Sequence, residues 1–255
     1  MLNLDRTHRS IPVAAMAFAV ALLAGCHKPY GTDGPQGHVR FKVEATWEGQ
    51  PLQAGSVHLN VSNYRTQVEQ LKVYLAELRL TGPGGASELT EIALFDALNG
   101  GTQRVYAAEA GTYSDLHLGL GVPAALNASD PVLYPVGHPL SVSNGTYWTW
   151  ATGYRFVMFD GRYDTDPNGT GVPTSLFSIH TGMDPCYRVT DLHFAAPFTV
   201  NGGDTTDLVL RLEVDRFFHN SLDTIDLAVD HQAHGENMPL AMRFSDHVLG
   251  SITVQ

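Results

Sequence analysis

The chain is poor in cysteine and in positive charge. It has two cysteines in 255 residues, and its 15 Lys and Arg face 26 Asp and Glu, which gives a formal net charge of −11. With so few cysteines the fold cannot depend on a disulfide framework, so packing must hold it together. The acidic balance argues against nucleic acid as a partner, because phosphates are bound by basic surfaces.

The sequence also lacks the common catalytic and nucleotide-binding motifs. It contains no Gly-x-Ser-x-Gly, no phosphate-binding glycine loop and no Cys-x-x-Cys. Leu118-Gly119-Leu120-Gly121 lacks the remaining glycine of a dinucleotide site. The sequence therefore gives no positive evidence for catalysis.

The N-terminus has the order of an export signal. Two arginines precede an apolar run from Ile11 to Leu23, which is too short for a comfortable transmembrane helix. The run ends in Leu23-Ala24-Gly25-Cys26, which resembles the lipobox of bacterial lipoproteins, where the cysteine thiol is acylated. His27 stands where an inner-membrane retention signal has Asp. We expect a lipid-anchored protein on the periplasmic face of the outer membrane; the alternative is an ordinary secretion signal with an accidental cysteine.

These features divide the chain into three parts. Residues 1–25 are expected to be the signal peptide, and residues 26–37, rich in Gly and Pro, a lipidated tether. Residues 38–255 are long enough to bury one substantial core and contain no second linker, so we expect one domain. Once Cys26 carries lipid, Cys186 is the remaining thiol.

Short alternating segments indicate strands. Val39 to Trp47 alternates apolar and polar residues, and Leu208 to Val214 repeats the pattern. Turn formers such as Asn99-Gly100-Gly101 and Asn201-Gly202-Gly203 separate the apolar runs, as tight hairpins require. We therefore expect an all-β fold, a single antiparallel β-sandwich or barrel-like domain.

Residues 68–80 fit two interpretations. They alternate as a strand does up to Leu75, and the apolar positions then slip in phase at Leu78. The spacing of Val68, Leu71, Leu75 and Leu78 also matches one face of a helix. We favour a strand with a bulge.

Histidines are unusually numerous for a chain with so few cationic residues. The chain has 12 of them, and imidazole is the usual ligand for copper and zinc at neutral pH. His231 and His234 form a His-x-x-His motif, but Gly235 and Asn237 favour a loop over the helix that would align both rings. This motif is therefore a weak signal on its own.

Trp148 and Trp150 lie two residues apart, so on a strand they share a face. Two explanations fit this Trp-x-Trp segment: an aromatic ridge in the core, or an exposed platform on which a sugar stacks.

Five segments occur in an order that resembles one known family. They are Gln50-Pro51-Leu52, the run from Leu71 to Leu75, the run from Leu116 to Pro123, the run from Tyr147 to Tyr154, and the run from Phe177 to Gly182. In this order and spacing they resemble the MbnP-like family of periplasmic copper-binding proteins, first associated with methanobactin operons.

The resemblance implies a mononuclear copper site built from histidines and a tryptophan oxidised to kynurenine. In the family a protein related to di-haem cytochrome c peroxidases is thought to perform the oxidation, which makes this chain its substrate and partner. Copper acquisition or handling is the implied role; the alternative is a metal-free lipoprotein that binds carbohydrate or a protein through an aromatic face.

The resemblance also suggests the site residues. His180 matches the family pattern best, and His58 and His117 are the next choices of ligand. His193 and His247 are further candidates, and the oxidised residue is Trp148 or Trp150.

Overall fold

The computed structural model describes residues 35–149 and 152–255. The predicted signal peptide, Cys26 and Trp150 lie outside the described residues. The described residues form one compact unit. None of the helices in the described part of the chain is long and apolar enough to cross a membrane.

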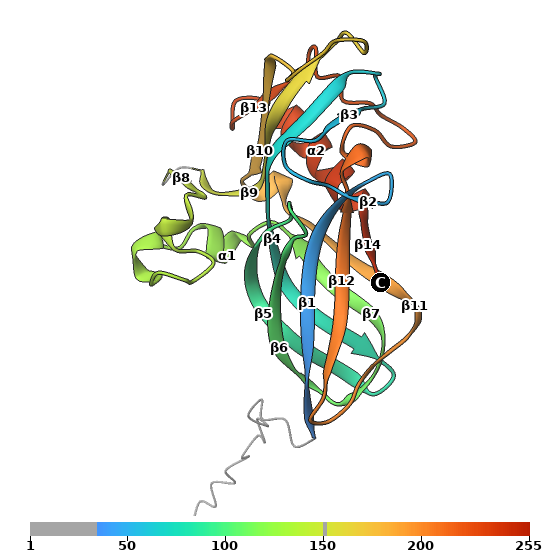
Figure 1. Ribbon diagram of the computed structural model, residues 1–255. Helices are drawn as coiled ribbons and strands as arrows, with labels where there is room; N and C mark the ends of the chain where they lie inside the picture. Colours follow the sequence, from blue (N-terminus) through green and yellow to red (C-terminus); the bar gives the residue numbers. More distant parts are fainter. Residues whose placement is uncertain (1–34, 150–151) are drawn as a thin grey trace, which may run out of the picture. The chain divides into compact units, whose positions relative to one another are not determined.

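One sheet has five strands, with β1 near its centre. The order is β14, β12, β1 and β2, and β6 also pairs with β1. Figure 1 shows β1 and β12 running side by side. The bounds are β1 (Gln36–Trp47), β2 (Gln50–Pro51), β6 (Thr102–Glu109), β12 (Thr205–Glu213) and β14 (Ile252–Val254).

The second sheet has nine strands. Its main order is β11, β7, β4, β9, β10 and β13, while β3 and β5 pair with β4, and β8 pairs with β9. The bounds are β3 (Val57–Leu59), β4 (Arg65–Gly82), β5 (Gly85–Asp96), β7 (Gly111–Leu120), β8 (Tyr147–Thr149), β9 (Gly153–Asp164), β10 (Ser175–Gly182), β11 (Arg188–Val200) and β13 (Gln232–Ala233).

Helices are short and few among the described residues. They are α1 (Ala124–Asn127), α2 (Met238–Gly250) and 3-10 turns at Pro131–Leu133, Val142–Asn144, Asp184–Cys186 and Val214–Phe217.

The alternating segments form the strands that the sequence predicts. The apolar set of β1, from Val39 to Trp47, is buried, and so are Leu208, Leu210 and Leu212 of β12. The all-β prediction is confirmed. The two strands nevertheless run parallel, as do β10 and β13, so each sheet is mixed. Local patterns fix which face a residue occupies but not the direction of a partner strand distant in sequence.

β4 confirms the interpretation of residues 68–80 as a bulged strand. Its pairing with β9 extends from Arg65 to Val73 and shifts in register between Val68 and Gln70. Its pairing with β7 extends from Leu75 to Thr81 and shifts again before Arg79. Glu77, at this second shift, has a left-handed φ of 54°. The extra residue changes the phase of the alternation, as bulges do.

The inner face of β9 and β10 packs against α2. Phe159 of β9 stacks on Phe244 of α2 at 5.4 Å between ring centroids, and it also meets Phe177 of β10 at 4.9 Å. In Figure 1 α2 lies beside β10 in the upper part of the molecule. Because successive side chains in a strand point to opposite faces, this packing leaves the next residues of both strands on the outer face.

Candidate metal centre

The outer face of β9 and β10 carries four side chains with metal-binding or polar atoms. Asp160 lies opposite Ser178, and Met158 lies opposite His180. His180 is only 8% exposed. Strand alternation therefore places these four side chains in one block.

A second histidine reaches this block from the neighbouring strand. Gln232 of β13 pairs with Ser178, and His234 follows two residues later. The rings of His180 and His234 lie 4.8 Å apart between centroids. The pairing of β13 with β10 thus brings together two histidines that are 54 positions apart in the chain.

Ser178 connects the two histidines. Its Oγ lies 2.7 Å from His234 Nε2 and 3.4 Å from His180 Nε2, and it donates to Asp160 Oδ1 at 2.5 Å. His180 Nε2 lies 2.9 Å and 3.0 Å from the two oxygens of Asp160. Both Nε2 atoms therefore converge on a single hydroxyl group.

This network indicates the protonation pattern of the two rings. The Gln232 amide donates to His234 Nδ1 at 3.3 Å, so Nε2 of His234 carries the proton that Ser178 accepts. Since Ser178 donates to Asp160, the second donor to that carboxylate is His180 Nε2. The Nδ1 lone pair of His180 is then left for another ligand.

Electrostatics favour a neutral His234 beside a charged carboxylate. Burial lowers the pKa of His234, and the adjacent His180 lowers it further. Burial by itself would raise the pKa of Asp160, but hydrogen bonds from His180 and Ser178 outweigh it and leave that pKa below its usual value. An imidazole that stays neutral below its ordinary pKa keeps a lone pair for metal binding.

Trp148 covers the two histidines. Its ring centroid lies 6.2 Å from that of His180 and 6.1 Å from that of His234, with both pairs edge-on. The guanidinium of Arg155 lies 5.5 Å from the Trp148 centroid. Trp148 is only partly buried, so it contributes to this cluster and not to a core ridge.

The structure does not bring His58 and His117 to this cluster. Along β4, His58 is level with Thr66 and His117 with Arg79. Met158 of β9 pairs with His180 on one side and with Lys72 of β4 on the other, so His180 is level with Lys72. At about 3.3 Å per residue, each of the two is roughly 20 Å away from His180 along the strand. The three histidines therefore cannot share one ion in this conformation.

Each of these two histidines has its own partner. His58 stacks on Trp47 at 4.8 Å between centroids, and its Nε2 lies 2.8 Å from Ser56 Oγ. His117 Nδ1 lies 2.7 Å from Asp191 Oδ1. His247, a further candidate, is buried with Nδ1 3.0 Å from the carbonyl oxygen of Phe217.

Sequence reasoning missed His234 as a partner of His180. The His-x-x-His motif contained it, but its two central residues form β13 and not a helix, and His231 faces Tyr163 instead. Ser178 could have been found, because it shares a strand face with His180 in the Phe177-Ser178-Ile179-His180 segment. His234 could not, because its contact depends on a long-range strand pairing.

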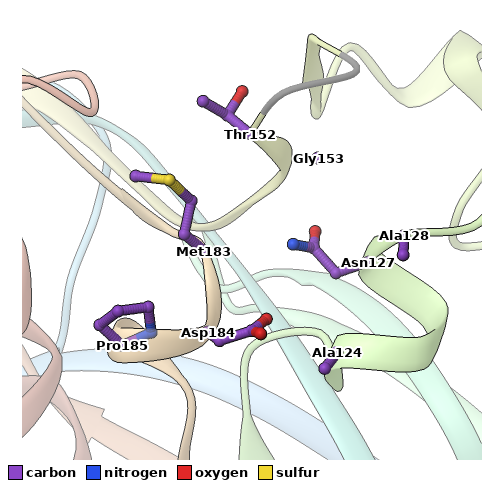
Figure 2. A pocket seen from close by; sticks show the side chains of 8 residues that line it. All are labelled: Ala124, Asn127, Ala128, Thr152, Gly153, Met183, Asp184 and Pro185. Carbon is purple, nitrogen blue, oxygen red and sulfur yellow. The ribbon is translucent and has the colours of Figure 1, made fainter.

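A separate open pocket lies at the start of β9. It is lined by α1, by Thr152 and Gly153, and by Met183, Asp184 and Pro185, and no histidine lines it (Figure 2). Asn127 points into it in the figure, and Asn127 Oδ1 accepts from the backbone N–H of Tyr154 at 2.8 Å. The hydrogen bond from Tyr154 to Asn127 therefore fixes the start of β9, five residues beyond Trp148.

Comparison with known proteins gives one family match and one similar solved structure. No curated protein matches this chain. The solved structure of MbnP from Methylosinus trichosporium is 18% identical, with 74% of this chain and 79% of that chain covered and a TM-score of 0.46. The model of the MbnP family matches residues 36–238, which span every segment on which the resemblance depends. This chain belongs to the MbnP family.

Proposed function

We propose that this protein binds one copper ion beside Trp148 and takes part in copper acquisition or handling. His180 and His234 are the nitrogen ligands, and Trp148 is the residue oxidised to kynurenine by a di-haem peroxidase-like partner. The protein acts as a binding protein and not as an enzyme. It is anchored by lipid on Cys26 to the periplasmic face of the outer membrane.

One observation carries this proposal. Two ring nitrogens, from His180 and His234, lie within 3.4 Å of the same hydroxyl oxygen, under the edge of a tryptophan. Imidazole suits copper, and two neighbouring rings supply half of a four-coordinate site. Because both Nε2 atoms carry protons, the Nδ1 atoms would bind copper, which at His234 would take the place of the Gln232 amide. A pair of core histidines would have no need of a shared polar centre.

The rest of the coordination sphere must come from other atoms. Across residues 35–149 and 152–255, no three His, Cys, Asp or Glu side chains form a ready ligand set. Met158, opposite His180 in the ladder, offers a thioether, which suits the softer Cu(I) ion. An intact indole offers an N–H donor and no suitable lone pair.

Oxidation of Trp148 would supply the missing donor. The partner would break the indole C2–C3 bond and place one oxygen atom on each carbon, using two molecules of hydrogen peroxide as oxidant and releasing two of water. Hydrolysis of the resulting N-formyl group by one further water then releases formate. The product side chain carries a ketone and an aromatic amine, both with lone pairs. Since Trp148 faces both imidazoles, these new atoms would form at the edge of the site.

Asp160 and Ser178 would act as outer partners of the ligands. Each holds Nε2 of one ring by a hydrogen bond and so makes Nδ1 the nitrogen that would bind the metal. Such partners orient metal-bound histidines, and their loss typically lowers metal affinity about 10–100-fold.

The test is copper affinity in three variants. We expect His180→Ala and His234→Ala each to lower it at least about tenfold, or about 1.4 kcal/mol. His231→Ala is the matched control, because His231 lies just before β13 but faces Tyr163. Unchanged affinity in both site variants, or an equal loss in the control, would remove this cluster from the copper site.

A further inference from the structure

The same tripeptide occurs on two neighbouring strands. Asp115-Leu116-His117 lies on β7 and Asp191-Leu192-His193 lies on β11. In the antiparallel ladder Leu116 is opposite Leu192, and each histidine is opposite the aspartate of the other strand. The two tripeptides are therefore related by a local two-fold axis.

The leucines and the polar residues occupy opposite faces. Leu116 is buried, and Leu192 packs against the core. His117 and His193 consequently share the outer face, together with Asp115 and Asp191. His193 has an exposed side chain, with 85% of its surface accessible, and His117 retains 14%.

Each histidine contacts an aspartate through the same ring nitrogen, and for His117 the contact is a hydrogen bond. His117 Nδ1 lies 2.7 Å from Asp191 Oδ1, and His193 Nδ1 contacts Asp115 Oδ1. Ser114 Oγ donates to the second oxygen of Asp115 at 2.5 Å, which fixes that carboxylate. A carboxylate on Nδ1–H leaves the lone pair on Nε2, which is the arrangement found behind metal-bound histidines.

We infer that His117 and His193 form a second metal site, which binds one divalent transition-metal ion, Zn²⁺ or Cu²⁺, through both Nε2 atoms. Diagonal neighbours in a ladder have Cα atoms about 7–8 Å apart, within reach of two imidazoles around one ion. Asp115 and Asp191 orient the rings, and water completes the coordination. With only two protein ligands, the site agrees with the lack of three-residue ligand sets among the described residues.

The charges around the pair favour a cation. Two carboxylates contact the rings, and the nearest cationic neighbour in the ladder, Arg79 opposite His117, lies 3.7 Å from Glu88. Thr81, opposite Asp115, is neutral. The local field is therefore negative, which attracts a metal ion.

This site is independent of the proposed copper centre. His117 and His180 lie at positions of β4 that are roughly 20 Å apart at about 3.3 Å per residue. The two sites share no side chain, so either can exist without the other.

Zinc titration of the full-length chain tests the inference. His180→Ala/His234→Ala serves as the background, so that the first cluster cannot contribute. We expect one bound Zn²⁺ whose affinity falls at least about tenfold in His193→Gln and equally in His117→Gln. Combining the two changes should add little, because one ring alone no longer chelates. Asp191→Asn should weaken binding about tenfold and keep the stoichiometry.

Two controls make the outcome decisive. His38→Gln alters an exposed histidine on β1 and should leave zinc binding unchanged. Urea unfolding of His193→Gln should match that of the parent, because its ring is exposed. Zinc binding that survives His193→Gln, or losses that simply add in the double variant, would overturn the inference. Anomalous diffraction from zinc-soaked crystals should place the ion between the two rings.

Discussion

At the scale of single residues, Ser178 has the most consequential contacts in the cluster. Its hydroxyl accepts from His234 and donates to Asp160, which in turn holds His180. The geometry of both proposed ligands thus depends on one small side chain that would not itself bind the metal.

Removing that hydroxyl should weaken copper binding. We predict that Ser178→Ala lowers copper affinity about 10–100-fold, because both rings lose their orientation. Ser178→Thr should restore most of the affinity, since threonine keeps the hydroxyl and suits a strand. Competition titration against a Cu(I) chelator measures both. Equal affinities in the alanine variant and the parent would show that Ser178 does not orient the rings.

His58 should make stability depend on pH. Burial lowers the pKa of His58, so folding favours its neutral form. Its stabilising contribution is complete above the unfolded-state pKa of about 6.5 and is lost as the pH falls through that value toward the lower folded pKa.

The check is urea unfolding of the parent and of His58→Gln between about pH 5 and pH 7.5. The free energy of unfolding should fall less steeply with acidification in the variant. The pKa of His234 is lowered as well, so His234 also makes the fold less stable at low pH. That effect is the same in the parent and in His58→Gln. Identical pH slopes would contradict the assignment.

At the scale of elements, the start of β9, which pairs with the β8 strand of Trp148, depends on Gly153. Gly153 has a φ of 69°, and a Cβ there would lie 2.2 Å from Asn127 Oδ1. That oxygen accepts a hydrogen bond from the N–H of Tyr154. Glycine therefore allows both the positive φ at position 153 and this hydrogen bond. Glycine is needed here for backbone conformation and for space.

Gly153→Ala should therefore lower the free energy of unfolding by more than the strain of a positive φ alone would. Gly145 provides the matched control, because its φ is 68° and nothing lies within 4 Å of a Cβ there. We expect Gly145→Ala to cost about 1 kcal/mol from the left-handed conformation. Gly153→Ala should cost at least about 2 kcal/mol, because the contact with Asn127 is lost as well. If chemical denaturation gives equal losses of stability for Gly153→Ala and Gly145→Ala, the Asn127 side chain moves aside without cost.

The sequence predicted elements better than it predicted their partners. The alternation in β1 and β12 identified both strands and their buried faces, because that information is local. The parallel pairing of β10 with β13 is not local, and it is what brings His234 to His180. Strand pairing also decides how far His58 and His117 lie from His180. The sequence does not show that pairing, so the prediction grouped all three histidines in one site although two of them lie far away along β4.

At the scale of the whole molecule, the described domain continues past the family match. The match ends at residue 238, yet α2 lies beyond it and packs Phe244 against Phe159 and Phe217. The C-terminal strand β14 pairs with β12 and so extends the five-stranded sheet. Residues beyond the family match therefore contribute to the core of the matched region.

The proposed lipid anchor is a prediction for the molecule as a whole. Cys26→Ala removes the thiol that would carry lipid, so the protein should move from the membrane fraction to the soluble envelope fraction. Cys186→Ala is the control, because that thiol is buried in the fold. Immunoblots of separated fractions measure the distribution. Membrane association that persists in Cys26→Ala would contradict lipidation at this position.

The most direct test of the account is the chemical state of Trp148 in protein produced together with a di-haem peroxidase-like partner. Peptide mass spectrometry and metal analysis after dialysis should find kynurenine at position 148 and one copper ion per chain. Without the partner, Trp148 should be intact and copper should be lost. Intact Trp148 and Trp150 in the co-produced protein, with no copper retained, would contradict the proposed function.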